Sequence, residues 1–326
     1  MANANLTAAK TAKNDEFYTR IEDIENELGH YWQHFKDATV LCNCDDPTYS
    51  NFWKYFFLNF EAMGLRKLIS THYDRVNSTY KMEYDGQGDP VVIPLESNGD
   101  FASAECVRLL EESDIVITNP PFSEFRKYVK QLMDYQKKFL IIGSENAITY
   151  KEFFPYLKDN MVWKGFNHVH EFLQPDGSIK KFGNICWFTN LDISKRHEDL
   201  ILYKQYSPEE YPTYDNYDAI NVDRVADIPM DYDGVMGVPI TFMDKYNPEQ
   251  FEIIGADGYD GTPFTKKYSA KEKVVNGVHM ASKTGALGCV IRMDSYGKGT
   301  YFDVGYPVKA VYKRIFIKKK RTGKVG

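Results

Sequence analysis

Asp114-Ile115-Val116-Ile117-Thr118-Asn119-Pro120-Pro121-Phe122 is the most informative segment of the chain. Its isoleucine, valine and threonine residues favour a buried strand over Ile115–Thr118. The two prolines then stop that strand, because proline has no N–H to donate to a ladder. The sequence therefore predicts a rigid turn at the C-terminal end of a strand, where open α/β sheets bind their ligands.

The residues of this turn suit a planar nitrogen base that carries an exocyclic amino group. The side-chain oxygen of Asn119 and the carbonyl oxygen of Pro120 can each accept one N–H. The ring of Phe122 can stack on the base. An ordinary strand-to-loop turn is the simpler interpretation, but the strand before the turn and the aromatic residue after it favour a functional role. The predicted catalytic residues are Asn119, Pro120, Pro121 and Phe122.

The composition is that of a globular protein with one large domain or two smaller ones. The chain has 326 residues, 43% of them hydrophobic and 26% charged. No run of 18 apolar residues occurs, so we expect no membrane span. Residues 1–13 lack the apolar region of a secretory signal and are expected to be disordered.

The cysteines indicate a reduced, cytoplasmic protein without a metal site. There are five of them, an odd number, and most lie in apolar stretches. Cys42 and Cys44 are two positions apart, but no second Cys or His pair completes a tetrahedral site.

The net charge of −6 is distributed unevenly along the chain. Residues 207–235 contain eight acidic residues and one basic residue, whereas residues 309–324 contain eight basic residues and no acidic one. Such a chain can present a positive face to nucleic acid despite its negative total. A solvated basic terminus is the alternative. We predict an edge strand whose basic side chains contact DNA phosphates, namely Lys313, Arg314, Lys318, Lys319, Lys320 and Arg321.

Strands and helices alternate between about residues 35 and 160. The expected strands are 39–44, 67–73, 91–95, 115–118 and 138–142, and the expected helices are 21–36, 49–63, 102–111, 122–136 and 153–158. This alternation predicts an α/β fold with a doubly wound, mostly parallel sheet. Two further strands, 161–165 and 184–190, with a turn at 174–177 between them, predict an antiparallel edge. Residues 204–235 are Tyr-rich, acidic and weakly periodic, which indicates a long loop or insertion.

Polar side chains follow several of the expected strands. Asp45 and Asp46 follow the first strand, Asp74 follows the second, and Asp100 precedes a helix. Doubly wound folds use carboxylates at strand ends to bind nucleosides. One aspartate after a strand is common, but the joint occurrence is more specific.

These motifs resemble the EcoRI family of adenine-specific DNA methyltransferases, which belong to the class I S-adenosylmethionine-dependent enzymes. The resemblance extends from about residue 13 to residue 320. It implies a Rossmann-like methyltransferase sheet and transfer of a methyl group from S-adenosylmethionine to N6 of adenine in duplex DNA. It also implies that the target base leaves the duplex. The matching segments are residues 14–19, 44–47, 50–52, 99–101, 118–122, 143–150 and 184–190.

The resemblance also assigns cofactor-binding residues. Phe17, Tyr18 and Thr19 match a motif at the methionine end of the cofactor, although Arg20 stands where many relatives have proline. Asp74 matches the ribose-binding position. The remaining implied contacts are Cys44, Asp45, Asp46 and Asn51, in a loop that lacks the usual Gly-x-Gly, then Asp100 and Phe101 at the cofactor's adenine, and Asn119.

By the same resemblance, residues 1–200 form the S-adenosylmethionine-binding catalytic domain and residues 201–326 form a target-recognition region that includes 204–235. The expected partner is double-stranded DNA, and no membrane partner is expected. A cognate restriction endonuclease is expected in the same system, without a stable complex with this chain. Oligomeric state stays open. Methylation of cytosine N4, RNA adenine or a glutamine amide on the same fold is an alternative, as is a non-catalytic nucleic-acid-binding protein. Attack on cytosine C5 is excluded because no cysteine follows a proline.

Overall fold

The computed structural model describes residues 18–74, 77–174, 177–258, 264–268, 272–283, 285 and 287–320. Phe17 and Arg321 lie outside the described residues, as do the N-terminal segment expected to be disordered and the two central residues of the turn at 174–177. The chain divides into two compact units, Met1–Ile193 and Ser194–Gly326, which we treat separately.

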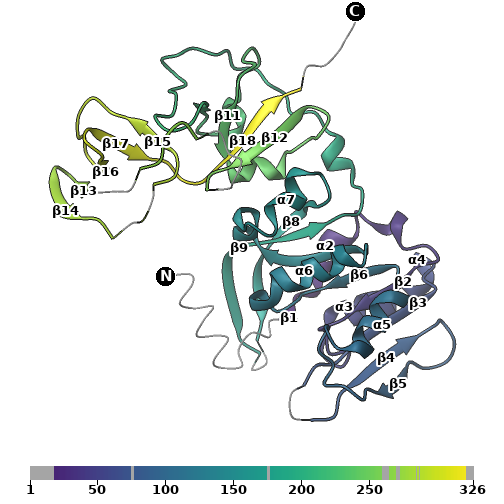
Figure 1. The fold of residues 1–326 in the computed structure, drawn as a ribbon. Coiled ribbons are helices and arrows are strands. Elements are labelled where there is room, and N and C mark those ends of the chain that lie inside the picture. The colour runs from purple at the N-terminus through teal and green to yellow at the C-terminus, as the bar shows by residue number, and fades with distance from the viewer. Residues whose placement is uncertain are drawn as a thin grey trace, which may run out of the picture. The chain divides into compact units, whose positions relative to one another are not determined.

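The first unit is built on a nine-stranded sheet with the order β1-β8-β9-β7-β6-β2-β3-β4-β5 (Figure 1). The strands are β1 (Tyr18–Thr19), β2 (Thr39–Cys42), β3 (Lys67–Thr71), β4 (Tyr80–Tyr84), β5 (Val91–Pro94), β6 (Ile115–Thr118), β7 (Lys138–Ser144), β8 (Trp163–Leu173) and β9 (Ile179–Thr189). The central strands β7, β6, β2 and β3 are parallel. β6 has the bounds that the sequence predicted, and it is buried along its whole length, as expected inside a covered parallel sheet.

Both edges of this sheet are antiparallel. β8 and β9 pair antiparallel with each other, as expected, and β9 pairs antiparallel with β7. At the other edge, β4 pairs antiparallel with β3 and with β5. The sheet is therefore mixed, and the expectation of a mostly parallel sheet was wrong. The short connections from β3 to β4 and from β4 to β5 explain this, because parallel neighbours need a long crossover.

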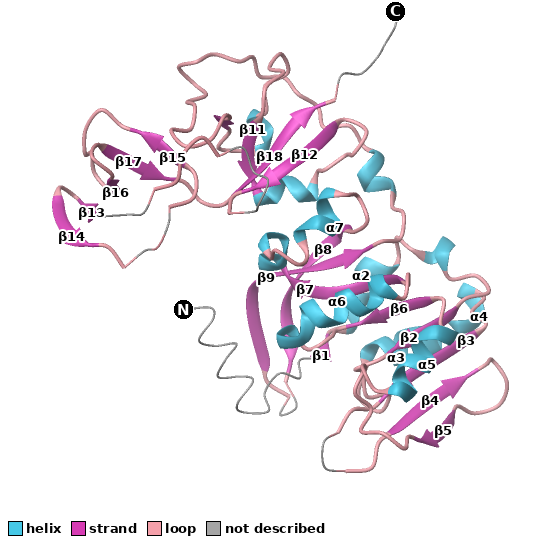
Figure 2. Ribbon diagram, viewed as in Figure 1, coloured by secondary structure: helices cyan, strands magenta, loops and turns pink. Residues whose placement is uncertain are grey.

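Helices lie against the sheet of the first unit (Figure 2), and large aromatic side chains make contacts between them. The helices are α2 (Ile21–Leu28), α3 (Asn51–Leu58), α4 (Phe60–Met63), α5 (Ala104–Glu112), α6 (Phe125–Asp134) and α7 (Phe154–Lys158). Trp187 and Phe188 are consecutive in β9, so their side chains point to opposite faces. Trp187 lies edge-on to Phe52 of α3, with ring centroids 6.0 Å apart. Phe188 lies 5.7 Å from Phe125 of α6, so helices cover both faces.

Local sequence explains where these helices begin and end. The hydroxyl of Ser50 accepts a hydrogen bond of 3.1 Å from the backbone N–H of Phe52, which caps α3. The helix expected over 49–63 breaks at Asn59, whose amide donates to the carbonyl of Tyr55 and whose backbone leaves the helical region. Gly64 has a φ of 66° and ends α4.

The second unit contains a four-stranded sheet, β10-β11-β18-β12, and a five-stranded sheet, β14-β13-β16-β17-β15. The strands are β10 (Ile220–Asn221), β11 (Met236–Pro239), β12 (Phe251–Ala256), β13 (Glu272–Val275), β14 (Val278–Ala281), β15 (Val290–Arg292), β16 (Thr300–Asp303), β17 (Pro307–Ala310) and β18 (Arg314–Lys319). β18 lies between β11 and β12. The expectation of an edge strand at this position was wrong, because Ile315, Phe316 and Ile317 are buried and need cover on both faces.

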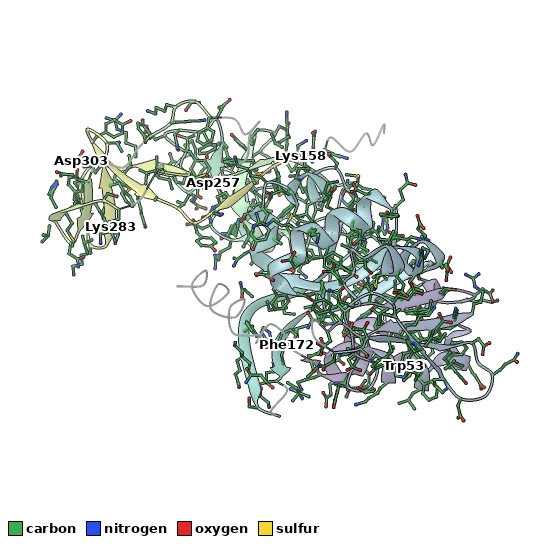
Figure 3. The ribbon with its side chains drawn as sticks, turned by 60° about the horizontal axis from the view of Figure 1, so that its bottom comes forward. Trp53, Lys158, Phe172, Asp257, Lys283 and Asp303 are labelled. Atoms are coloured by element: carbon green, nitrogen blue, oxygen red, sulfur yellow. The ribbon has the colours of Figure 1, made fainter. Side chains whose placement is uncertain are left out.

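The acidic Tyr-rich segment 204–235 is irregular, as expected, but its tyrosines contribute to the core of the second unit. Tyr214 and Tyr217 are buried. The ring of Tyr217 stacks on Phe316 with centroids 4.8 Å apart, and its hydroxyl donates a 2.8 Å hydrogen bond to Asp257, which is labelled in Figure 3. Across the described residues of both units, no helix is long and apolar enough to span a membrane.

Candidate active site

The strand order of the first unit creates a candidate ligand-binding edge between β2 and β6. β3, the next strand in the chain, is the neighbour of β2 on one side, and β6 is its neighbour on the other side. The carboxyl ends of these parallel strands meet at one edge, and ligands of open α/β sheets bind at such reversal points. The loop of residues 43–47 therefore lies beside the turn that begins at Asn119.

Hydrogen bonds join the loop after β2 to the turn after β6. The hydroxyl of Thr118, the last residue of β6, contacts the backbone carbonyl of Asn43 and the carboxyl Oδ2 of Asp45. The hydroxyl of Tyr128 in α6 donates to the side-chain oxygen of Asn43. The backbone N–H of Asn119 also hydrogen-bonds to Asp45. Sequence reasoning did not identify Thr118 as a site residue. Its position as the last residue of the strand was the available signal.

Asp45 occupies an environment that disfavours its charge. Burial raises the pKa of its carboxyl to about 7, against the opposing hydrogen bonds of Thr118, Asn119 and Ser50. The Ser50 hydroxyl lies 3.3 Å from Oδ1. This carboxyl is therefore held by protein groups on both of its oxygens.

The other residues of this loop fix its shape. Cys44 has a φ of 67°, a conformation that favours glycine. Burial raises the pKa of the Cys44 thiol. Asp46 accepts hydrogen bonds of 2.7 Å from the Tyr80 hydroxyl and 2.9 Å from the Thr48 backbone N–H. Nε2 of His72 lies 3.7 Å from Asp46.

Gly99 brings two further aspartates toward this edge. Its φ is 74°, and a Cβ atom at this position would lie 2.0 Å from the backbone oxygen of His72. The loops that carry Asp74 and Asp100 are therefore in direct contact, and the backbone N–H of Asp74 donates to the carbonyl of Asn98. Both carboxyl groups are partly exposed.

The ring of Phe101 is buried and does not present an open face for stacking. The ring is 6% exposed and lies edge-on to Tyr128, with centroids 5.0 Å apart. Nζ of Lys127 lies 5.0 Å from the ring centroid. The ring thus anchors the loop that carries Asp100 against α6.

The N-terminal motif and Phe122 meet the β8–β9 hairpin. Thr19 in β1 pairs with Phe172 in β8, and the side-chain amide of Asn51 donates a 2.7 Å hydrogen bond to the carbonyl of Thr19. The half-buried ring of Phe122 lies edge-on to Phe172 and Phe182, with centroids 6.2 and 6.1 Å away. Phe172, labelled in Figure 3, thus contacts residues of both motifs.

The basic residues in and directly beside β18 fall into two groups. Lys313, Lys318 and Lys320 are exposed. Arg314 is 7% exposed, and its guanidinium group contacts Asn221 at 3.2 Å and Asp223 at 3.4 Å.

Lys319 resembles Arg314 rather than its exposed neighbours. Nζ of Lys319 donates to the carbonyl of Met230, and its side chain is 14% exposed. Arg314 and Lys319 therefore both contact other groups of the second unit, and that they contact DNA stays a prediction.

Comparison with known proteins identifies the family. Residues 5–320 match the family described as adenine-specific methyltransferase EcoRI. The chain belongs to this family. It is therefore an adenine-specific methyltransferase, as the motifs predicted, and its reaction requires a methyl donor.

Three curated methyltransferases are similar to this one over most of their length. It is 45% identical to Type II methyltransferase M.EcoRI of Escherichia coli, over 84% of this chain and 93% of that protein. It is 40% identical to Type II methyltransferase M.MpnI of Mycoplasma pneumoniae, over 76% of this chain and 83% of that protein. It is 38% identical to Type II methyltransferase M.MgeORF184P of Mycoplasma genitalium, over 77% of this chain and 85% of that protein. The search of solved structures found no significant match.

Proposed function

We propose that this methyltransferase transfers a methyl group from S-adenosylmethionine to N6 of an adenine that has left a specific duplex DNA site. Residues 1–200 would form the catalytic domain, with a Rossmann-like methyltransferase sheet, and residues 201–326 the target-recognition region. The observation that carries the proposal is the position of the Asn119 turn. It lies at the strand-order reversal, and the backbone N–H of Asn119 is hydrogen-bonded to Asp45 in the loop that follows β2.

The residues at this edge fit S-adenosylmethionine chemically. Asp74 and Asp100 offer partly exposed carboxylate oxygens, which suit ribose hydroxyls and the adenine amino group. Oγ1 of Thr19 is buried, and among the described residues it has no hydrogen-bond partner. A ligand that reaches the N-terminal motif can satisfy such a group. When bound, this cofactor supplies an electrophilic methyl group.

The turn itself supplies the means to activate the acceptor nitrogen. An adenine amino group is a poor nucleophile because its lone pair is delocalised into the ring. If the Asn119 side-chain oxygen and the Pro120 carbonyl each accept one N–H, the nitrogen becomes more sp3-like and its lone pair is free to attack. Positioning and fixed acceptor dipoles then lower the barrier without a covalent intermediate.

Phe122 would hold the target base in place. Removing a base from the duplex costs a few kcal/mol, and stacking on an aromatic ring returns about 1–3 kcal/mol. Because Phe122 is braced by Phe172 and Phe182, its ring is fixed before the base arrives. A cognate restriction endonuclease would act on the same site in DNA without a stable complex with this chain.

Tritiated S-adenosylmethionine and unmethylated duplex DNA provide the test, followed by nucleoside analysis of the labelled DNA. We expect label in N6-methyladenine, and a loss of about 100-fold or more in Asn119→Ala, the scale seen when a fixed transition-state contact is removed. Asn26→Ala, on the exposed face of α2, is the control and should match wild type. Label in N4-methylcytosine, with none in N6-methyladenine, would overturn the proposed acceptor.

A further inference from the structure

Both carboxyl oxygens of Asp45 are within hydrogen-bonding distance of other groups of the protein. Its Oδ1 atom faces the Ser50 hydroxyl at 3.3 Å, and its Oδ2 atom contacts the Thr118 hydroxyl. The backbone N–H of Asn119 binds the same carboxyl group. Its own backbone carbonyl accepts a hydrogen bond from the hydroxyl of Ser70 in β3. Asp45 therefore joins the ends of β3 and β6 with the start of α3.

The Thr118 contacts indicate which protonation state of Asp45 this arrangement favours. The Thr118 hydroxyl lies within hydrogen-bonding distance of the Asn43 carbonyl and of Oδ2 of Asp45. A hydroxyl has one hydrogen, and a carbonyl oxygen can only accept. Both contacts are full hydrogen bonds at the same time only when Oδ2 carries a proton and donates it to the Thr118 oxygen.

We propose that Asp45 acts as a positioning residue in its protonated form, holding the Asn119 turn in place through Thr118, and that it is not a ligand of the methyl donor. This inference rests on the proposed function, because the turn must hold the acceptor amino group. It differs from the assignment that the family resemblance implies, in which Asp45 contacts the cofactor. A carboxyl group that pairs with the cofactor's ammonium group would need to be ionised.

The surroundings of Asp45 are consistent with a neutral carboxyl group. Burial raises its pKa to about 7, and no basic side chain is among the causes of that shift. The neighbouring thiols of Cys42 and Cys44 and the phenol of Tyr128 also have raised pKa values, so they stay neutral near pH 7. The other carboxylates near this loop are Asp46, the next residue, and Asp100, which interacts with Cys44.

The proposal predicts a pH dependence with a definite sign. A carboxyl group whose pKa is raised in the folded protein favours the folded arrangement below that pKa. Its contribution is lost as the pH rises through the raised value. The Thr118 contact, and with it the fixed position of Asn119, should therefore weaken above about pH 7.

Five proteins test the proposal: wild type, Asp45→Asn, Asp45→Ala, Thr118→Ser and Thr118→Val. For each, kcat is measured on duplex DNA from pH 6 to pH 9, and the Kd for S-adenosylhomocysteine is measured by calorimetry. Asparagine is neutral and can both donate and accept, so it imitates the protonated acid. Serine keeps the hydroxyl of Thr118, whereas valine keeps only its shape.

We expect Asp45→Ala and Thr118→Val to lower kcat about 10- to 100-fold, because a misplaced reacting group costs up to about 100-fold. Their Kd for S-adenosylhomocysteine should change less than about threefold, well under the tenfold that 1.4 kcal/mol represents. Asp45→Asn and Thr118→Ser should keep most of the wild-type kcat. Asp45→Asn should also remove the decline above pH 7.

Two results would overturn the inference. One is a Kd for S-adenosylhomocysteine that rises tenfold or more in both Asp45 variants, which would make Asp45 a cofactor ligand. The other is equal activity in Thr118→Val and Thr118→Ser. Wild type without activity on any DNA would instead overturn the proposed function. Carbon-13 NMR would then test the inference independently of activity. The inference requires a carboxyl signal that titrates near pH 7 and is missing in Asp45→Asn.

Discussion

The side-chain amide of Asn51 donates a 2.7 Å hydrogen bond to the backbone carbonyl of Thr19, 32 residues earlier in the chain. This bond attaches the short strand β1 to the first turn of α3. Tyr18 and Tyr49 support the same junction, with ring centroids 6.2 Å apart. The N-terminal motif therefore depends on the first residue of α3.

Replacement of Asn51 by alanine should weaken cofactor binding. One hydrogen bond contributes about 1 kcal/mol, so we expect the Kd for S-adenosylhomocysteine to rise roughly fivefold in calorimetry. Asn59→Ala is the matched control, since the Asn59 amide also donates to a backbone carbonyl, that of Tyr55 in α3, but at the other end of the helix. Equal Kd values for the two variants would contradict a role of β1 in cofactor binding.

Gly99→Ala should disrupt the loops that carry Asp74 and Asp100. The added Cβ would lie 2.0 Å from the His72 oxygen, so the backbone must move. Gly88→Ala is the control because Gly88 also has a positive φ, of 65°, but nothing lies within 4 Å of the added Cβ.

We expect Gly88→Ala to lower the free energy of unfolding by about 1 kcal/mol, the usual cost of alanine at positive φ. Gly99→Ala should cost more and should also weaken cofactor binding. Urea unfolding followed by tryptophan fluorescence can measure the difference, because all four tryptophans belong to the first unit. Equal losses in the two variants would contradict the steric argument.

Local sequence signals explain which elements could be predicted. β6 was located to the residue because β-branched residues are followed at once by two prolines, and both signals act within nine residues. The end of α4 at Gly64 is equally local. Pairing partners that lie far apart in sequence carry no such signal. The sequence therefore did not reveal the central place of β18 or the antiparallel pairing of β3 with β4.

In the candidate site, too, the features set by local sequence could be predicted and the contacts between distant residues could not. The strand-end positions of Asp45, Asp74 and Asn119 followed from the order of the strands. The contact between Thr118 and Asp45 spans 73 residues and depends on the register of β2 against β6. The burial of Arg314 depends on Asn221 and Asp223 in a different part of the second unit. Basic residues in a row indicate charge, but they do not indicate which side chains face inward.

Acid should destabilise the first unit through Glu145. Its carboxylate contacts Nζ of Lys164 at 2.6 Å and Nε2 of His168 at 3.5 Å, and the Lys164 side chain is 2% exposed. The hydrogen bond from His168 and the Lys164 ion pair, against burial, hold the Glu145 pKa at about 2. A lowered pKa contributes stability above the ordinary value of 4.5, and this stability is lost as the pH falls toward 2.

The loss between pH 5 and pH 2 should be about 3 kcal/mol from this group. Urea unfolding by tryptophan fluorescence over this range measures it. Glu145→Gln should remove this part of the acid dependence and destabilise the unit by about 3 kcal/mol at neutral pH, because the buried Lys164 ammonium group loses its ion pair with the Glu145 carboxylate. A steeper acid dependence in the variant than in wild type would contradict the assignment.

The exposed lysines in and directly beside β18 should contribute to DNA affinity through phosphate contacts. Each phosphate contact contributes about 0.9 to the slope of log K against log salt for duplex DNA. Lys313→Ala, Lys318→Ala and Lys320→Ala should each lower that slope by about 1 and weaken binding on all sequences alike. Fluorescence anisotropy of a labelled duplex from 50 to 300 mM KCl measures both.

Lys319→Ala separates charge from structure in the same strand. Because Nζ of Lys319 donates to the Met230 carbonyl of the same unit, its removal should lower thermal stability and leave the salt slope unchanged. It removes the same formal charge as Lys318→Ala or Lys320→Ala, so net charge cannot explain a difference between them. Equal slopes in all these variants would mean that DNA approaches another face of the second unit, and that the basic tail is a solvated terminus.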